Sequence, residues 1–492
     1  MTQTQDVALA PSDVIWTAKE AAMMTNGQLN DSSNAEWMAW GISIDSRTVQ
    51  KGDIFVALKG DMNGHDYVRD ALEKGAVSAI VSESPKGCAS DAPLLMVHDT
   101  LVALQDLGQG ARYRTAAKII AVTGSVGKTG TKEMLAAALT PQGNTHAAQK
   151  SFNNHIGVPL TLATMHAGSD YGIFEIGMNH AGEITPLSEQ VKPDIAIITT
   201  VAPVHLEHFE DGIQGIAKAK AEIFAGMGVG SHAVVNHDIE TFPILKAQAD
   251  LDNITLVTFG KSNTSDSILL ECLVAANGTR VKASIMGEEI SYLLQWSGEH
   301  IAMNSIGVLT AIKLAGADIK KAATAMSRLE APAGRGRREY IDLVETANPV
   351  TLIDDSYNAS PTSMKAAFKV LALIDPGRGG RRIAVLGDML ELGGDAPKKH
   401  ADMALPIRTA NIDLVYTCGS LMKNLHKALP NDNKGAHCEN STELSEIVTD
   451  VLVPGDVVMV KGSLGSKMNV VVEALRALPN KVKTKQKEQN VI

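Results

Sequence analysis

The sequence predicts an α/β protein built from three domains. Its 492 residues suggest about three domains at the usual ~150 residues each. Eight short apolar runs rich in β-branched residues are each followed by a Gly- or Asp-containing turn and a helical stretch. Such runs suit strands that are buried on both faces, and their alternation with helices indicates parallel sheets. The runs lie at 118–124, 171–177, 194–201, 232–236, 351–356, 382–388, 413–419 and 456–463.

Two breaks in this pattern define the domains. The first lies between about 82 and 115, where SESPKGCASDAP precedes the run that begins at Lys118. The second is APAGRGRRE (331–339), a Pro/Gly/Arg-rich stretch that follows a long Ala-rich helix and is typical of a linker. We therefore expect a smaller N-terminal α/β domain, a central parallel-sheet domain and a Rossmann-like C-terminal α/β domain. Their predicted limits are 1–100, 101–332 and 333–492.

Composition and charge exclude several classes of protein. With 45 basic and 55 acidic residues the net charge is −10, so binding of polyanions through the bulk electrostatic field is not expected. Aromatic residues make up 4%, too few for a nucleic-acid surface built from stacking platforms. Hydrophobic residues at 45% and charged residues at 20% are ordinary for a globular protein. We expect a monomer that binds no nucleic acid.

The termini and the cysteines bear on location. The N-terminus lacks a basic region followed by an apolar run, and no stretch approaches the ~20 apolar residues of a membrane span. The four cysteines lie far apart without a CxxC pair, as in proteins with reduced thiols. We expect a cytoplasmic protein without stable membrane insertion. The basic end, 481–492, is interpreted as a frayed tail, with an electrostatic membrane contact as the alternative.

The sharpest local signal is a candidate phosphate-binding loop between a buried strand and a helix. Its glycines would let backbone N–H groups converge on phosphate oxygens at a helix N-terminus. Lys128 would reach the β- and γ-phosphates, and the Thr129 hydroxyl would ligate Mg²⁺. Val122 stands where the full Walker pattern has glycine, so the loop predicts nucleotide binding without choosing among kinase, ligase, GTPase and motor. The loop comprises Gly124, Ser125, Val126, Gly127, Lys128 and Thr129.

Two further residues follow buried strands of the central domain. Glu175 ends an apolar strand, where a carboxylate is costly unless it is paired or bound to a metal. His205 follows the next strand, and ligands collect at the carboxyl ends of strands in α/β sheets. Together they could ligate a second Mg²⁺; a structural glutamate and a loop histidine are the alternative. Spacing alone makes the helical Lys220 a solvated surface residue.

The C-terminal domain carries two comparable segments. Asp354 to Pro361 follows a strand and precedes a helix, so its Asp and Asn residues either serve a site or end the strand and cap the helix. Lys461-Gly462-Ser463 closes another strand with the same two interpretations.

Blocks distributed along nearly the whole chain resemble the Mur ligase family, the ATP-dependent amide-forming enzymes of peptidoglycan precursor synthesis. About ten blocks stand in family order, which makes coincidence a poor explanation. They include DSR (45–47), GDIFVALKG (52–60), TGSVGKT (123–129), NNHIGVP (153–159), EIGMNHAGEI (175–184), AKAEIF (219–224), GEHIAMN (298–304), GRGRRE (334–339), DDSYNASPTSM (354–364) and LGDMLELG (386–393), with the His205 segment between the fifth and sixth.

The resemblance implies roles for individual residues. Lys220 falls on the family's carbamylated lysine, which helps to hold Mg²⁺, and this replaces the surface interpretation drawn from spacing. Glu175 and His205 match the other metal-site positions, so with Lys128 and Lys220 they form the expected catalytic group, served by ATP and two Mg²⁺. The resemblance also assigns Asn304 and Arg335 to the nucleotide and brings Asp355 to the ATP site when the domains close.

Two blocks resemble the family member that adds a dipeptide rather than a single amino acid. The implied substrates are a UDP-muramoyl tripeptide and D-alanyl-D-alanine, with the amine bound by the C-terminal domain. One departure is Gly130, where relatives often carry a bulkier residue. Candidate substrate residues are Ser46 and Arg47 for the UDP portion, Asn153 and Asn154, and, for selection of the dipeptide, Asn179, His180, Asn358 and Ser360.

Three alternatives remain open from the sequence. One is another amide ligase of the same superfamily, such as folylpolyglutamate synthase or the tripeptide-forming muramoyl ligase. The second is a kinase, which would release a phosphorylated product and no free phosphate. The third is a non-catalytic nucleotide-binding protein, against which the joint presence of Lys128, Glu175, His205 and Lys220 argues. The diamino acid of the tripeptide is not encoded in any of these patterns.

Overall fold

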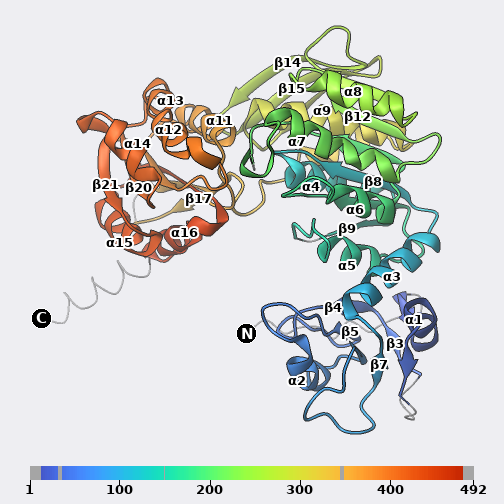
Figure 1. The fold of residues 1–492 in the computed structure, drawn as a ribbon. Coiled ribbons are helices and arrows are strands. Elements are labelled where there is room, and N and C mark those ends of the chain that lie inside the picture. Colours follow the sequence, from blue (N-terminus) through green and yellow to red (C-terminus); the bar gives the residue numbers. More distant parts are fainter. Residues whose placement is uncertain (1–12, 31–35, 149, 205, 344–347, 480–492) are drawn as a thin grey trace, which may run out of the picture.

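The computed structural model describes residues 13–30, 36–148, 150–204, 206–343 and 348–479. Three units, each built around its own sheet, follow one another along the chain. The N-terminal unit lies below the central one, and the C-terminal unit lies beside the central one (Figure 1). The α/β class predicted from the sequence is confirmed. The basic tail, 481–492, lies outside the described residues.

The N-terminal unit contains a five-stranded sheet of order β2-β7-β6-β5-β4 and a separate β1–β3 pair. Strands β4 to β7 are parallel, and β2 pairs antiparallel with β7 at the edge. The strands are β1 (Trp16–Thr17), β2 (Gln28–Leu29), β3 (Met38–Ala39), β4 (Gly41–Ser43), β5 (Asp53–Val56), β6 (Ser78–Val81) and β7 (Leu94–Met96), and the helices are α1 (Ala18–Thr25), α2 (Val68–Glu73) and α3 (Thr100–Tyr113).

Helix α3 joins this unit firmly to the next one. Asp99 caps its N-terminus by accepting from the backbone N–H groups of Leu101 and Val102. The helix packs on α1 and also on two helices of the central unit. Beside it, the Trp16 indole donates to the Ala163 carbonyl at 2.8 Å, and the Arg114 guanidinium lies 4.0 Å from the Trp16 ring centroid. The predicted break at 82–115 therefore contains a strand and a long helix rather than a loose connection.

The central unit is a nine-stranded sheet of order β16-β15-β14-β13-β12-β11-β8-β10-β9. The four predicted runs of this region are all strands, and β8 to β13 are parallel. Strands β14 to β16 form an antiparallel meander that the parallel pattern did not include. The strands are β8 (Lys118–Thr123), β9 (Thr145–Ala147), β10 (Tyr171–Glu175), β11 (Ile195–Ile198), β12 (His232–Asn236), β13 (Thr255–Gly260), β14 (Ser267–Ala275), β15 (Gly278–Ile285) and β16 (Glu288–Leu294).

Helices cover both faces of this sheet and create two cores. One core contains α4, α9 and α10, and the other contains α5 to α8. The long Ala-rich helix expected before 331 is two helices, separated at Gly316, whose φ of +81° favours glycine. The helices are α4 (Lys128–Leu139), α5 (Gly157–Ala163), α6 (Ile184–Val191), α7 (Ile213–Ala221), α8 (Phe242–Leu251), α9 (Glu299–Leu314) and α10 (Ile319–Met326).

The C-terminal unit is a six-stranded sheet of order β17-β18-β22-β19-β20-β21, parallel except for β17. The linker predicted at 331–339 is too long, since β17 already begins at Arg337 and pairs with β18. The strands are β17 (Arg337–Ile341), β18 (Val350–Asp355), β19 (Arg382–Gly387), β20 (Leu414–Cys418), β21 (Lys434–Cys438) and β22 (Val457–Lys461), and the helices are α11 (Pro361–Ala372), α12 (Ala396–Ala401), α13 (Ala404–Thr409), α14 (Met422–Ala428), α15 (Ser441–Val451) and α16 (Asn469–Arg476).

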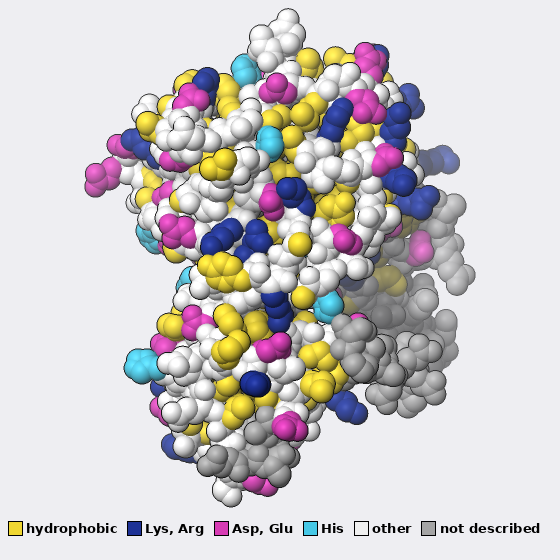
Figure 2. All heavy atoms as spheres, turned by 90° about the vertical axis from the view of Figure 1, so that its right-hand side faces the viewer, with side chains coloured by type: hydrophobic (Ala, Val, Ile, Leu, Met, Phe, Trp, Pro, Cys, Tyr) yellow, Lys and Arg dark blue, Asp and Glu magenta, His cyan; other side chains and the backbone are white. Residues whose placement is uncertain are grey.

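The surface carries charges of both signs. On the face shown in Figure 2, basic and acidic side chains are interspersed rather than gathered into separate areas. Within the described ranges, no helix is long and apolar enough to cross a membrane.

A buried histidine holds the segment that follows β19. The His400 ring is fully buried in α12, where its Nε2 accepts from the Met389 N–H at 2.9 Å. Its Nδ1 lies 2.7 Å from the Ala396 carbonyl, so it carries the proton and donates. Burial lowers the pKa of His400 below its ordinary value of 6.5.

We expect this histidine to make stability depend on pH. Below about pH 6.5 the unfolded chain binds a proton that the native imidazole does not, so stability is lost as the pH falls towards the lowered pKa. As the pH falls through that window, the free energy of unfolding of the wild type should decrease, relative to that of a His400→Gln variant, by up to about 1.4 kcal/mol per pH unit. Urea denaturation between pH 7.5 and 5 measures this, and equal slopes for the two proteins would contradict it.

Candidate active site

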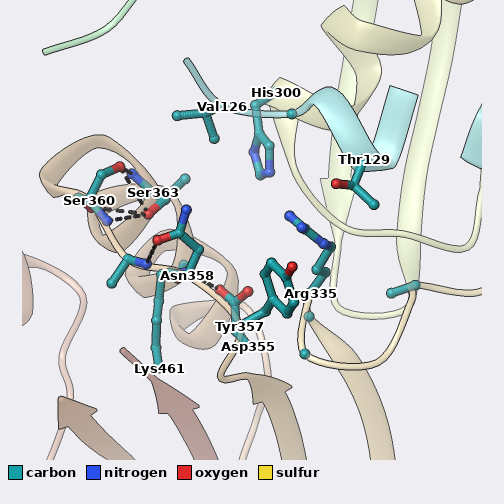
Figure 3. Close-up of a pocket in the computed structure, with 18 of the residues that line it drawn as sticks. Val126, Thr129, His300, Arg335, Asp355, Tyr357, Asn358, Ser360, Ser363 and Lys461 are labelled. Atoms are coloured by element: carbon teal, nitrogen blue, oxygen red, sulfur yellow. Dashed lines mark hydrogen bonds and ion pairs between the residues drawn. The ribbon is translucent and has the colours of Figure 1, made fainter. Parts of the chain in front are cut away.

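A cleft of about 830 Å³ lies between the central and C-terminal units. On the central side it is lined by the predicted phosphate loop and the first turns of α9. The opposite wall comes from the segments that follow β18, β19 and β22, and the 334–338 segment joins the two walls. Figure 3 shows Thr129, Val126 and His300 facing Arg335, Tyr357 and Asp355 across this space.

The predicted strand–loop–helix geometry is confirmed. The loop connects β8 to α4, and two of its glycines have positive φ, +148° at Gly124 and +91° at Gly127. A Cβ at Gly124 would lie 1.9 Å from the Thr199 hydroxyl oxygen, and one at Gly127 would lie 2.4 Å from the Asn304 amide nitrogen. Neither position has room for a side chain, so the backbone itself forms the wall of the site.

Lys128, the first residue of α4, lies inside the loop. Its Nζ donates to the Gly124 carbonyl at 2.7 Å. Burial lowers the pKa of Lys128, and the nearby Glu175 carboxylate opposes that effect. The ammonium group is therefore held where the loop's N–H groups and the N-terminus of α4 converge.

Glu175 ends β10 at this edge of the sheet and organises a cluster of oxygen atoms. It is 2% exposed and accepts from the Thr129 hydroxyl at 2.9 Å and from the Asn153 amide at 2.8 Å. The Ser151 hydroxyl lies 3.0 Å from that of Thr129. Hydroxyl and carboxylate oxygens are the ligands that Mg²⁺ prefers, and Mg²⁺ needs few of them because it retains water. The residues present therefore fit this cation.

Lys220 is buried, and the surface position expected from helical spacing alone is wrong. Its side chain is 2% exposed in α7. Burial, and after it the neighbouring Lys128, lower the pKa of Lys220 well below its ordinary value. The two lysines thus come from separate helices to the same edge of the sheet, with Lys220 favoured as the neutral amine.

His205 lies outside the described residues. Within the described part of the chain, no group of three or more His, Cys, Asp or Glu residues could hold a metal ion. Of the predicted metal-site residues, the structure thus describes Thr129, Glu175 and Lys220.

Asn304 and His300 project from α9 into the cleft. Asn304 is buried against the phosphate loop at Gly127. His300, one turn earlier, faces the cavity (Figure 3). The His300 side chain is exposed to the cleft, and desolvation there, together with the charge of Lys461 on the opposite wall, lowers the pKa of His300 below its ordinary value. His300 was not predicted, although its i,i+4 spacing to Asn304 places both on one helix face.

Arg335 connects the two walls. Its guanidinium lies 4.3 Å from the Tyr357 ring centroid, and one of its nitrogens lies 3.4 Å from the Ser151 hydroxyl. Below it, Lys461 is 3% exposed and forms an ion pair with Asp355 at 2.7 Å. Lys461 also donates to the Asn358 carbonyl at 2.9 Å. Burial raises the pKa of Asp355, and Lys461 opposes that effect.

Asn358 and Ser360 line the same cleft, but part of their polarity serves the local fold. Ser360 is the N-cap of α11 and forms a reciprocal capping box with Ser363. The side-chain oxygen of Asn358, Oδ1, accepts a hydrogen bond from the Ala359 N–H at 2.8 Å. The helix is therefore capped by Ser360 and not by the Asp and Asn residues for which the sequence left that interpretation open.

The structure brings most of the predicted site residues to one cleft, but not all of them. Ser46 and Arg47 lie in the N-terminal unit after β4, where Arg47 is exposed and paired with Asp45 at 2.7 Å. Asn154 accepts from the Gly157 N–H at the start of α5. The described residues that line the cleft include Ser125, Val126, Gly127, Lys128, Thr129, Asn153, Glu175, Asn304, Arg335, Asp355, Asn358 and Ser360.

Asn179 and His180 also lie away from the cleft lining. The Asn179 N–H donates to Glu183, and the His180 ring packs against that of His208 at a tilt of 45°, with centroids 4.2 Å apart. His208 belongs to a short turn at 206–208 that packs against residues 393–395 of the C-terminal unit. These two candidates therefore lie near a second contact between the units.

Comparison with known proteins agrees with this architecture. Three family models match in order: "Mur ligase family, catalytic domain" at 40–112, "Mur ligase middle domain" at 122–312 and "Mur ligase, glutamate ligase domain" at 336–464. The UDP-N-acetylmuramoyl-tripeptide–D-alanyl-D-alanine ligase of Rickettsia prowazekii is 32% identical, over 94% of this chain and 99% of its own. The ligase of the same name from Escherichia coli is 32% identical, over 92% and 98%.

Solved structures show the same three-unit fold. A crystal structure of MurF from Acinetobacter baumannii superimposes with a TM-score of 0.80 and 27% identity, covering 94% of this chain and 98% of that one. The chain belongs to the Mur ligase family. It is an ATP-dependent enzyme that forms amide bonds.

We expect the Glu175 carboxylate to govern the response to Mg²⁺. Glu175→Gln preserves the shape of the side chain but removes the negative charge, so the Mg²⁺ concentration for half-maximal activity should rise about 10- to 100-fold. Titrating activity with Mg²⁺ measures this. The matched control is Glu189→Gln on the exposed face of α6, which should leave the titration unchanged. An unchanged titration for Glu175→Gln would remove this residue from the metal site.

Proposed function

We propose that this enzyme joins the terminal carboxylate of a UDP-N-acetylmuramoyl tripeptide to the amine of D-alanyl-D-alanine, converting ATP to ADP and phosphate. The observation that carries the proposal is the cleft in which the phosphate loop faces Arg335, Asp355 and Lys461 of the opposite wall. The choice of substrates is supported by the names of the relatives, which match over nearly their full lengths.

The chemistry requires activation of the carboxylate. A carboxylate is a poor electrophile because its leaving group would be oxide. Transfer of the γ-phosphoryl group from ATP produces an acyl phosphate, whose leaving group is phosphate. The dipeptide amine then attacks the acyl carbon, loses a proton and forms a tetrahedral intermediate, which expels phosphate to give the amide.

The first step brings together two anions, the carboxylate and the γ-phosphate, and the second develops an oxyanion beside the phosphate leaving group. The cleft supplies matching donors. Lys128 and the N–H groups of the loop lie at the proposed position of the β- and γ-phosphates. Arg335 reaches the same space from the linker and is held by Tyr357. Thr129, Glu175, His205 and a carbamylated Lys220 would hold two Mg²⁺, which would add electrostatic stabilisation of the transferring phosphoryl group.

The proposed carbamate on Lys220 has a physical basis. A lysine ammonium beside Lys128 would repel a metal cation, whereas a carbamate offers anionic oxygens of the kind Mg²⁺ prefers. Only the neutral amine can attack carbon dioxide, and the lowered pKa of Lys220 favours that form. The group that forms would then be neutralised by the cation it helps to bind.

We assign one substrate to each unit. The N-terminal unit, predicted at 1–100, would hold the UDP end through the region of Ser46 and Arg47. The central unit, 101–332, would hold ATP, and the C-terminal unit, 333–492, would deliver the amine past Asn358 and Ser360. Asn153, Asn154, Asn179 and His180 stay candidate substrate residues of the central unit. We further propose that the enzyme acts as a monomer in the cytoplasm.

A phosphate-release assay tests the proposed substrates. With ATP, Mg²⁺ and the UDP-muramoyl tripeptide, we expect phosphate release to depend on added D-alanyl-D-alanine and to rise by at least tenfold when it is present. Single amino acids replace the dipeptide as the matched comparison. Equal release with D-alanine or L-glutamate would contradict the dipeptide assignment and favour another amide ligase of the superfamily.

Chemical rescue tests the carbamate. Lys220→Ala should lose at least 100-fold in kcat because it removes a metal ligand, and it leaves a buried space that a short carboxylate such as acetate or propionate can enter. We expect partial recovery that saturates with carboxylate concentration. Lys218→Ala, an exposed lysine on the same helix, is the control that needs no rescue. Absence of rescue at every concentration would count against the carbamate.

A further inference from the structure

Trp296 occupies the junction between the phosphate-loop helix and the linker to the C-terminal unit. It lies between β16 and α9 and is 8% exposed. Its carbonyl accepts from the Thr279 hydroxyl at 3.0 Å, and the same hydroxyl accepts from the Gly298 N–H at 3.0 Å. The backbone on both sides of the tryptophan is therefore anchored to β15.

One edge of the indole lies against Gly130 in the first turn of α4. A Cβ at Gly130 would lie 2.9 Å from Trp296 Cη2, a distance that forces one of the two groups to move. Glycine inside a helix costs roughly 1 kcal/mol relative to alanine, so its presence directly after Lys128-Thr129 calls for a reason. The indole, packed where a side chain at position 130 would lie, supplies that reason.

The other edge of the indole holds the linker. Its Nε1–H donates to the Arg335 carbonyl at 3.2 Å. The residues around this carbonyl are tied to the C-terminal unit, because the Gly334 N–H donates to the Asp354 carboxylate at 3.0 Å and the Tyr357 N–H donates to the Gly334 carbonyl at 3.0 Å. Arg335 is thus fixed from the central unit by Trp296 and from the C-terminal unit by its neighbours.

We propose that Trp296 is a positioning residue that fixes Arg335 relative to the phosphate-loop helix α4, and that Gly130 leaves the space in which the indole packs. The proposal rests on the ATP-dependent ligase activity in which Arg335 meets the nucleotide. Misplacement of a charged group by about 1 Å can cost a hundredfold in rate. The rigid ring, in contact with Gly130 on one side and the linker on the other, sets where the Arg335 guanidinium enters the cleft.

A double-mutant cycle between Gly130 and Trp296 tests the coupling. Gly130→Ala should push the indole from the linker and lower kcat at least tenfold, with the KM for ATP changed less than threefold. Trp296→Phe removes both the N–H donor and the far ring edge and should lower kcat similarly. In the Trp296→Phe background the added methyl has room, so Gly130→Ala should cost less than threefold more.

Several outcomes would overturn the proposal. One is a tenfold effect of Gly130→Ala in both backgrounds, which would mean that the two residues act independently. Another is a Gly130→Ala variant whose kcat stays within twofold of the wild type. Gly228→Ala, at a glycine with open space around it, is the control and should leave kcat unchanged. Thermal melting of each variant separates a loss of fold from a loss of positioning.

Nucleotide-induced fluorescence gives a second readout that does not need the acceptor substrates. The chain has four tryptophans, and the other three, Trp16, Trp37 and Trp40, precede β4 in the N-terminal unit. We expect ADP with Mg²⁺ to change the tryptophan emission of the wild type but not of Trp296→Phe. An identical change in both proteins would contradict the proposal. If the wild type responds to ADP yet shows no release of phosphate with D-alanyl-D-alanine, the substrate assignment fails and the role of Trp296 stands.

Discussion

The architecture of the cleft depends on holding like and unlike charges together out of water at one edge of the central sheet. Glu175 enters this edge on β10 and is satisfied by Thr129 and Asn153. Lys128 lies on α4 and Lys220 on α7, and burial, followed by the proximity of Lys128, lowers the pKa of Lys220. Buried ions are tolerated only when they are paired, neutralised or bound to a metal. The parallel strands, the tight glycines and the oxygen cluster all serve that requirement.

Much of the fold was predictable because its signals are local. Each of the eight apolar runs forms a strand, and the phosphate loop stands at the predicted strand-to-helix junction. These features depend on residue type and on near neighbours in the sequence. The antiparallel β14–β16 meander was missed because its residues alternate between buried and exposed, a pattern of period two that differs from the all-apolar runs that were sought.

The site residues that escaped sequence reasoning are those defined by tertiary contacts. The spacing of residues in α7 does not distinguish Lys220 from the exposed Lys218. Lys220 differs from it in being buried beside Lys128. Only the family resemblance predicted a role for Lys220 in metal binding. Ser151 was not predicted, and its place in the site follows only from its contacts with Thr129 and Arg335. Lys461 was ambiguous at the end of its strand until the structure paired it with Asp355. The reason for a glycine at position 130, directly after Lys128 and Thr129, lies in its contact with Trp296, which is distant in the sequence.

The two junctions between the units differ in kind. Helix α3 contributes to a core that also contains Leu160 and Ala163 of α5, so separating the first two units would expose apolar surface of both (Figure 1). The central and C-terminal units meet across an open cleft, through one chain crossing, a few polar contacts and the contact of residues 206–208 with residues 393–395. Because of this shared core, we expect any motion that changes the width of the cleft to move the first two units together. The distance from the phosphate loop to the N-terminal sheet should then stay nearly constant.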